Sequence, residues 1–139
     1  EYKKSIEKPT NKTNELKIIN SVYAFKIIAG ASKKNKAVDL FETLVKGNYI
    51  DITSKNDFID AFIGKNPNKK INWIGAFGDL KSFIKYSISE NLIEKVSTKW
   101  IYTTHLFTHR NNEITNSSLN NAKITTNDSS IKKIVKSIL

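Results

Sequence analysis

Residues 71–93 constrain the fold more than any other part of the chain. An apolar stretch broken by Gly75 and Gly78 leads into a segment with apolar side chains at helical spacing. These apolar residues are Leu80, Phe83, Ile84 and Ile88, with Lys81, Lys85 and Glu90 on the opposite side. The pattern is typical of an amphipathic helix with one face in the core. It predicts an extended segment over 71–74 and a core helix that ends near Ser89.

The rest of the chain shows further helical patterns, separated by glycines or by polar turns such as 65–70 and 108–113. They predict helices over about 13–29, 33–46, 55–63, 97–107, 116–122 and 128–139. Ser54 with Asp57, and later Thr115, stand where residues that cap a helix are expected. Residues 97–107 also have strand propensity, so a strand is the alternative there. The sequence therefore predicts a mainly α fold, a compact bundle of five to six helices with at most a short strand pair.

Length and composition bound the domain organisation. The 139 residues suit one domain, and we expect a flexible basic leader over 1–12 and a helical domain over 13–139, or two lobes over 13–64 and 65–139. The chain begins at Glu1 and has no Met, which indicates a trimmed or processed product. The absence of Cys excludes disulfides, thiolate catalysis and cysteine-ligated zinc. No apolar run could span a bilayer and no signal peptide is present, so we expect a cytoplasmic protein without a membrane partner.

Charge gives the first indication of a partner. The chain has 23 Lys and Arg against 13 Asp and Glu, a net charge of +10, and such a balance favours polyanions. Arg110 is the one arginine, however, and proteins that recognise guanine use arginine forks. A solvated, lysine-rich surface that follows from AT-rich coding is therefore the alternative explanation. Residues 37–64 are acidic, with two Lys and five carboxylates, so a polyanion is expected to contact the N-terminal arm and the C-terminal half.

No constellation of residues predicts an enzyme. His105 and His109 have the spacing of metal ligands on a helix, with Glu113 four residues further, but the third ligand of known helical zinc sites is missing. Two polar residues at a helix end are the simpler interpretation. Asp57, Asp60, Asp79 and Lys81 match no strict nuclease motif, and the glycines lack the context of a phosphate-binding loop. We therefore expect no catalytic residue, no metal and no cofactor.

A series of residues in the second half of the chain resembles a known family. The series is Trp73, Gly75, Leu80, Phe83, Ile84, Leu92, Ile93, Trp100, Phe107, Ile114, Thr115, Leu119, Lys123, Ile131 and Leu139. It is similar to the C-terminal domain of RteC-like proteins, helical regulators carried by mobile elements of Bacteroidetes, and to uncharacterised relatives, over about residues 37–139. The resemblance implies a winged-helix-like DNA-binding domain. The segment after Phe107 differs from that expectation, because it is rich in Asn and poor in Arg.

These observations lead to two functional hypotheses. The first is a non-enzymatic DNA-binding or transcription-regulatory module of a mobile element, with a helix-turn-helix or winged-helix-like C-terminal half. Its groove-facing residues are expected to be Ser117, Ser118, Asn120, Asn121 and Lys123, because Asn pairs well with adenine. Its phosphate contacts are expected to be Lys65, Lys69, Lys70, Lys132, Lys133 and Lys136. The alternative is a protein-interaction module, an accessory or inhibitor protein of a phage or mobile element, that uses the surface of residues 37–64.

Overall fold

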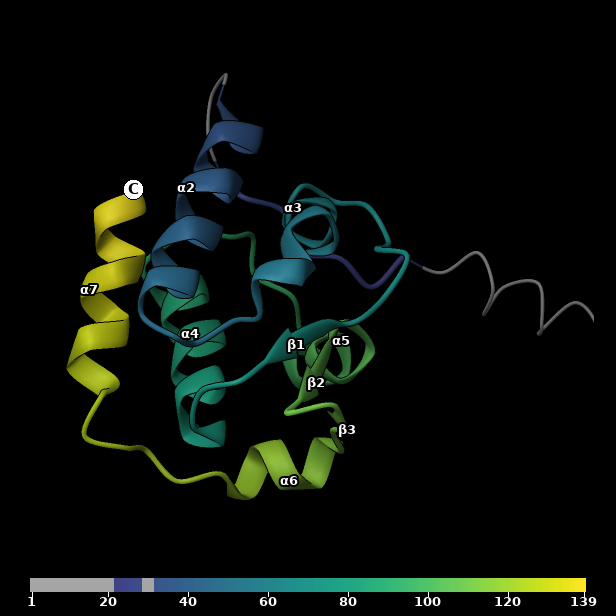
Figure 1. The fold of residues 1–139 in the computed structure, drawn as a ribbon, viewed down its shortest axis with the longest axis vertical. Coiled ribbons are helices and arrows are strands. Elements are labelled where there is room, and N and C mark those ends of the chain that lie inside the picture. Colours follow the sequence, from purple (N-terminus) through teal and green to yellow (C-terminus); the bar gives the residue numbers. More distant parts are fainter. Residues whose placement is uncertain (1–21, 29–31) are drawn as a thin grey trace, which may run out of the picture.

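The computed structural model describes residues 22–28 and 32–139. As expected, the fold of this part is mainly helical, with a small sheet beside the helices (Figure 1). The helices are α2 (Lys33–Lys46), the short 3₁₀ helix η2 (Ile52–Ser54), α3 (Lys55–Phe62), α4 (Phe77–Ser89), α5 (Lys99–Leu106), α6 (Asn116–Asn121) and α7 (Asp128–Ile138). The strands are β1 (Ile71–Trp73), β2 (Phe107–His109) and β3 (Asn112–Glu113). None of the described helices is long and apolar enough to cross a membrane.

The sheet is larger than the strand pair that the sequence predicts. Its strand order is β1-β2-β3, with β1 parallel to β2 and β2 antiparallel to β3. Ile71 lies opposite Phe107, which joins two segments far apart in the sequence. Arg110 and Asn111 form the turn between β2 and β3, with φ values of 49° and 67°, as in the hairpin turns that match strand twist. The expectation of at most a strand pair was therefore wrong, because strands of two or three residues leave no periodic signal.

The helix predicted over 13–29 is wrong for the described residues 22–28, which are extended. The backbone N–H groups of Phe25 and Ile27 donate to the carbonyl oxygens of Ala61 (2.7 Å) and Phe62 (3.0 Å). Phe25 and Ile27 are buried, whereas Lys26 and Ile28 between and after them are exposed. This alternation is that of a strand, and it overrides the helical spacing of the same apolar residues. Residues 13–21 of the prediction lie outside the described residues.

The core is built around α4, as residues 71–93 predict. Trp73 stacks on Phe83 at 5.7 Å between ring centroids, and its indole N–H donates to the carbonyl of Ala76 (3.0 Å). One cluster of buried side chains contains residues from both predicted lobes, for example Phe41 and Phe83. In Figure 1, α7 lies against α4 on one side and α2 packs on α7 and α3, and the sheet with α5 lies on the other side of α4.

The connections between helices differ from those of a helix-turn-helix motif. That motif joins its two helices by a turn of about three or four residues. Among the described α-helices, α4 and α5 are joined by 90–98, α6 and α7 by 122–127, and α5 and α6 by the β2–β3 hairpin. Every one of these connections is longer than such a turn. The C-terminal half is therefore a set of helices around a small sheet.

Candidate nucleic-acid interface

The position of α6 is set by contacts with the first turn of α4. Gly78 is buried there, and a Cβ at this position would lie 1.9 Å from the carbonyl oxygen of Lys123. The side chains of Thr125 and Asn127 donate hydrogen bonds to the buried carboxylate of Asp79. Lys81 lies one turn further along α4. The loop after α6 is thus pinned to α4 by backbone contact and by a buried carboxylate.

Lys81 completes this attachment. Its Nζ donates to the carbonyl oxygens of Asn120 (2.8 Å) and Ala122 (3.2 Å), which are orphan acceptors at the end of α6. At the other end of α6, Thr115 forms the predicted cap: its hydroxyl accepts from the backbone N–H of Ser118 at 3.1 Å. A six-residue helix is marginal by itself, so these contacts hold it in place.

The predicted groove-facing residues on α6 divide into two kinds. The hydroxyl of Ser118 donates to the carbonyl of Thr115 and accepts from its N–H, and the hydroxyl of Ser117 lies 3.3 Å from that of Thr115. Both hydroxyls therefore serve the cap. Asn120 and Asn121 are exposed, as is Lys123, and within the described part of the chain their side chains make no hydrogen bond. These three side chains are available to a ligand.

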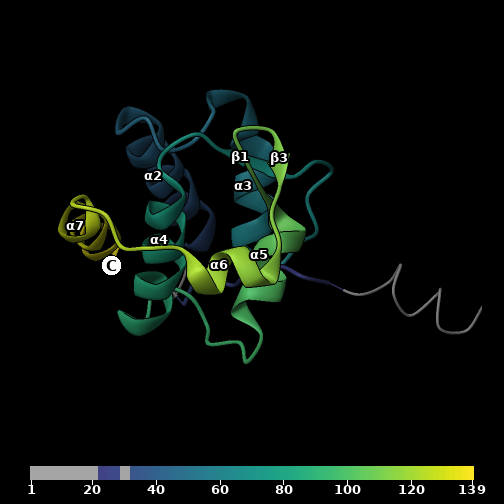
Figure 2. The same cartoon turned by 90° about the horizontal axis from the view of Figure 1, so that it is seen from below.

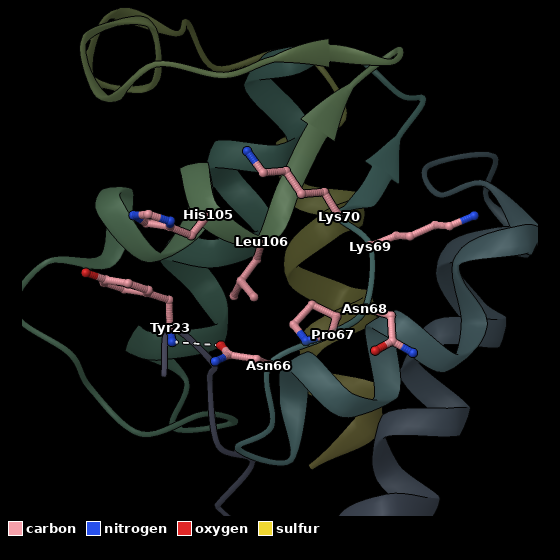
Figure 3. A pocket seen from close by; sticks show the side chains of 8 residues that line it. All are labelled: Tyr23, Asn66, Pro67, Asn68, Lys69, Lys70, His105 and Leu106. Carbon is pink, nitrogen blue, oxygen red and sulfur yellow. Dashed lines mark hydrogen bonds between the residues drawn. The ribbon is translucent and has the colours of Figure 1, made fainter. Parts of the chain in front are cut away.

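The predicted phosphate-binding loop, 65–70, carries lysines in different states. Lys70 is half-buried, and its Nζ donates to the carbonyl of Thr104 (3.0 Å) and to Glu113 (2.5 Å), so its charge is compensated. Lys65 and Lys69 are exposed, and their side chains have no partner among the described residues. Figure 3 shows Lys69 and Lys70 pointing to different sides of the loop.

The predicted lysines on α7 also differ among themselves. Lys132 lies over the ring of Tyr86 at 5.5 Å. The Tyr86 hydroxyl donates to Asp128 at 2.5 Å, and this hydrogen bond, together with one from Ser82, holds the pKa of Asp128 below its ordinary value. The same hydrogen bond raises the pKa of Tyr86. Lys133 and Lys136 are exposed on the outer face of α7.

The structure does not bring the predicted residues onto one face. In Figures 1 and 2, α7 lies at one side of the molecule, the loop that leads into β1 lies at the opposite side, and α6 lies between them. Instead, α7 runs antiparallel to α2 and packs against it, so its last turn lies at the end of the molecule where α2 begins (Figure 1). The lysines of these two turns, together with Lys133 about one turn before the end of α7, form the α2–α7 lysine end: Lys33, Lys34, Lys36, Lys133 and Lys136.

Two of the residues considered for catalysis, His109 and Asp57, make structural hydrogen bonds. His105 and His109 do not share a helix face, because α5 ends at Leu106 and His109 lies on β2, where its Nε2 is 2.9 Å from the carbonyl oxygen of Gly75. Asp57 accepts a hydrogen bond from the backbone N–H of Lys69. In the described part of the chain, no group of three or more His, Cys, Asp or Glu residues could hold a metal ion.

Two surface features escape prediction from the sequence. One is a hollow beside the stacked rings of Tyr23 and His105 (Figure 3). The other is an apolar groove of about 360 Å³ between α2 and η2, in which Phe41, Val45 and the strongly exposed Ile52 take part. The exposed Ile52 begins η2, the single 3₁₀ turn before α3, and so short an element has no sequence periodicity that tells a buried side chain from an exposed one.

Comparison with known proteins gives no relative from which a function could be transferred: no family model, no curated protein and no solved structure matches the chain.

Proposed function

We propose that the chain is a non-enzymatic DNA-binding module that contacts phosphates through the α2–α7 lysine end. The proposal rests on one observation: the first turn of α2 and the C-terminal end of α7, which both carry lysines, lie at the same end of the molecule (Figure 1). The first turn of α2, Lys33 to Lys36, contains three lysines and no carboxylate. The last turn of α7 contains Lys136 and no carboxylate. Clustered lysines without intervening acids are the electrostatic footprint of a polyanion site.

The lysines of α2 lie at the end of the helix that itself carries positive charge. The N-terminus of a helix carries a partial positive charge, which disfavours cations by roughly 0.3–1 kcal/mol each. Lys33, Lys34 and Lys36 all lie in the first turn of α2, and the exposed ammonium groups of α7 increase the repulsion. A bound phosphate relieves it, because it accepts hydrogen bonds from the backbone N–H groups of the first turn, which have no partner within the helix, and because it neutralises the lysines.

The proposal concerns phosphate contacts rather than base recognition. Asn120 and Asn121 on α6 could bind base edges, but α6 lies away from the α2–α7 lysine end (Figure 1). One straight duplex would not reach both. We therefore propose binding with little sequence preference, which also agrees with the single arginine of the chain. The resemblance to RteC-like proteins implies a regulatory role in a mobile element, and we include that role in the proposal.

The test is a salt titration of binding to a short duplex by fluorescence anisotropy. Each phosphate contact contributes about 0.9 to the slope of log affinity against log salt concentration. We expect Lys33→Gln, Lys34→Gln, Lys133→Gln and Lys136→Gln, combined, to lower the slope by about 3.6, one phosphate contact for each lysine, and to abolish most binding at physiological salt.

A charge-matched control separates local from general electrostatics. Replacing Lys26, Lys46, Lys55 and Lys95 by Gln removes the same net charge from exposed positions elsewhere. We expect this control to keep a slope close to that of the wild-type chain. Equal losses in both variants, or no binding of the wild-type chain at low salt, would refute the proposal.

A second candidate function is docking of a protein, and the apolar groove favours it. Ile52 is 69% exposed beside Val45 and the edge of Phe41, with Glu42, Lys46 and Lys55 around them. An exposed apolar patch with a charged rim is typical of a protein interaction site. If this candidate is correct, Ile52→Glu abolishes association with a captured partner, whereas the combined lysine variant still binds it.

A further inference from the structure

The apolar groove between α2 and η2 takes no part in the proposed DNA site. Its centre consists of Phe41 and Val45 on the α2 wall and of Ile52 on the η2 wall. Ile52 is the most exposed large apolar side chain in the described part of the chain, at 69%. Single exposed apolar side chains are common, but here three of them line one groove of about 360 Å³. Covering this groove would therefore contribute binding free energy.

Hydrogen bonds on both sides of Ile52 hold it in its exposed position. The carboxylate of Asp51 accepts from the backbone N–H of Thr53 at 3.0 Å and from the Thr53 hydroxyl at 2.9 Å. The backbone N–H of Asp51 donates to the carbonyl of Asn72 on β1 at 3.1 Å, and the hydroxyl of Ser54 accepts from the Asn72 N–H at 3.2 Å. The turn is thus tied to the sheet. A backbone fixed in this way loses little entropy when a partner covers the side chain.

The rim of the groove carries charges of both signs. Glu42 and Lys46 are exposed on the α2 wall, and Lys55 is exposed where η2 leads into α3. Among the described residues, Glu42 and Lys55 have no ion pair and no side-chain hydrogen bond. A purely acidic partner would be repelled by Glu42, and a purely basic partner would be repelled by Lys55. The rim therefore fits a partner that presents both signs of charge in a matching arrangement.

The charge of the whole chain indicates which face a second copy can approach. Two chains of charge +10 repel each other over most of their surfaces. Residues 37–64 are different, because they contain two Lys and five carboxylates, and the groove lies within them. The lysines in the first turn of α2 lie about 15 Å from Val45, at a rise of about 1.5 Å per helical residue. A contact at the groove therefore leaves the α2–α7 lysine end free.

We propose that the apolar groove binds a second copy of this chain and forms a two-fold dimer. The proposal rests on the second candidate function and names its partner. With the two-fold axis along the groove, the α2 wall of each copy lies against the η2 wall of the other. Ile52 then packs between Phe41 of the partner subunit and Val45 of the partner subunit, and Glu42 pairs with Lys55 of the partner subunit. Each of these contacts occurs twice in the dimer.

The first test is sedimentation equilibrium of the full chain from about 10 μM to about 1 mM, a range that detects the weak dimers typical of small interfaces. We expect reversible dimerisation. Ile52→Glu should raise the dissociation constant about a hundredfold, because each dimer loses two buried isoleucines and each is worth about tenfold. Ile52→Leu keeps the apolar surface and should stay within about fivefold of the wild-type chain. Circular dichroism establishes that each variant is folded.

Reversal of the rim charges tests the arrangement of the two copies. Glu42→Lys and Lys55→Glu each place like charges against each other twice, so each alone should weaken the dimer about tenfold. The first variant raises the net charge and the second lowers it by the same amount, so general repulsion would change the two affinities in opposite directions. The double variant should recover the wild-type affinity to within about threefold. Lys95→Glu, at an exposed position outside the groove, is the matched control and should not weaken the dimer.

A mixture of isotope-labelled and unlabelled chains identifies the face. Intermolecular NOEs should connect the methyl groups of Ile52 with the ring of Phe41. The combined α2–α7 lysine variant should dimerise at least as tightly as the wild-type chain, whatever the duplex titration shows.

Three results would overturn the proposal: a chain that stays monomeric over the whole concentration range, a dimer that Ile52→Glu leaves intact, or rim variants whose affinities follow net charge. If the chain is monomeric but Ile52→Glu still abolishes capture of a different protein, the dimer is refuted while the second candidate function stands. The two failures are thereby distinguished.

Discussion

The contact between Gly78 and the backbone of Lys123 predicts that Gly78→Ala destabilises the protein. In most helices this change stabilises by up to about 1 kcal/mol. Here the new Cβ would lie 1.9 Å from a carbonyl oxygen and 3.2 Å from Cγ2 of Thr125. The loop 122–127 must therefore move by more than 1 Å or α4 must shift, and both are held by hydrogen bonds from Lys81 and to Asp79.

The magnitude follows from these contacts. Overpacking costs about 1–3 kcal/mol, and loss of one or two of the hydrogen bonds that hold the loop adds about 1 kcal/mol each. After subtraction of the gain in helix propensity, we expect the free energy of unfolding to fall by about 2–3 kcal/mol. For a chain of this size the melting temperature should fall by roughly 10 °C.

The assay is thermal and urea unfolding followed by circular dichroism at pH 7, with Ser89→Ala as the control. Ser89 is exposed at the end of the same helix, so its replacement should change stability by no more than about 0.5 kcal/mol. A melting temperature of Gly78→Ala equal to or above that of the wild-type chain would refute the reasoning, because it would mean that α4 and the backbone after α6 are not in contact.

Three further predictions concern the ends of helices and strands. Asp128→Asn should lower the free energy of unfolding at neutral pH. Because the folded-state pKa of Asp128 is lowered, the difference in unfolding free energy from wild type should vanish as the pH falls from about 4 through that lowered pKa. Urea unfolding over a pH series measures this difference. A pH-independent difference would contradict it. Tyr86→Phe should raise the pKa of Asp128 towards its ordinary value, observable by NMR titration of the carboxyl carbon. Arg110→Asn with Asn111→Gly should stabilise by about 0.5–1 kcal/mol, because both positions have positive φ; destabilisation in urea would argue against the turn.

The helices that the sequence predicts are those whose signal is local. In α4, spacing alone identifies the buried residues Leu80, Phe83 and Ile84. The cap at Thr115 is equally local, since donor and acceptor are three residues apart. The prediction for Ser54 failed because its hydroxyl accepts from the backbone N–H of Asn72 instead. A partner so distant in the sequence cannot be found from the residues around Ser54.

The features that the sequence misassigned or missed also depend on contacts between residues far apart in the sequence. Residues 22–28 carry apolar side chains that suit a helix or a strand, and the choice is made by backbone partners at Ala61, Phe62 and Leu92. The hollow beside the stacked rings of Tyr23 and His105 depends on the same docking of an extended segment beside α5. For the candidate interface, the sequence identified exposed lysines, but the α2–α7 lysine end arises only because those two helices pack antiparallel.

The most direct test of the account is an NMR titration of the isotope-labelled chain with a short DNA duplex at low salt. If the α2–α7 lysine end binds phosphate, the amide signals of the first turn of α2, residues 33–36, and of the C-terminal half of α7, residues 133–138, shift together and return when salt is raised. Shifts confined to residues 41–55 around the apolar groove, or no shifts at all, would contradict the proposal that these lysines bind phosphate.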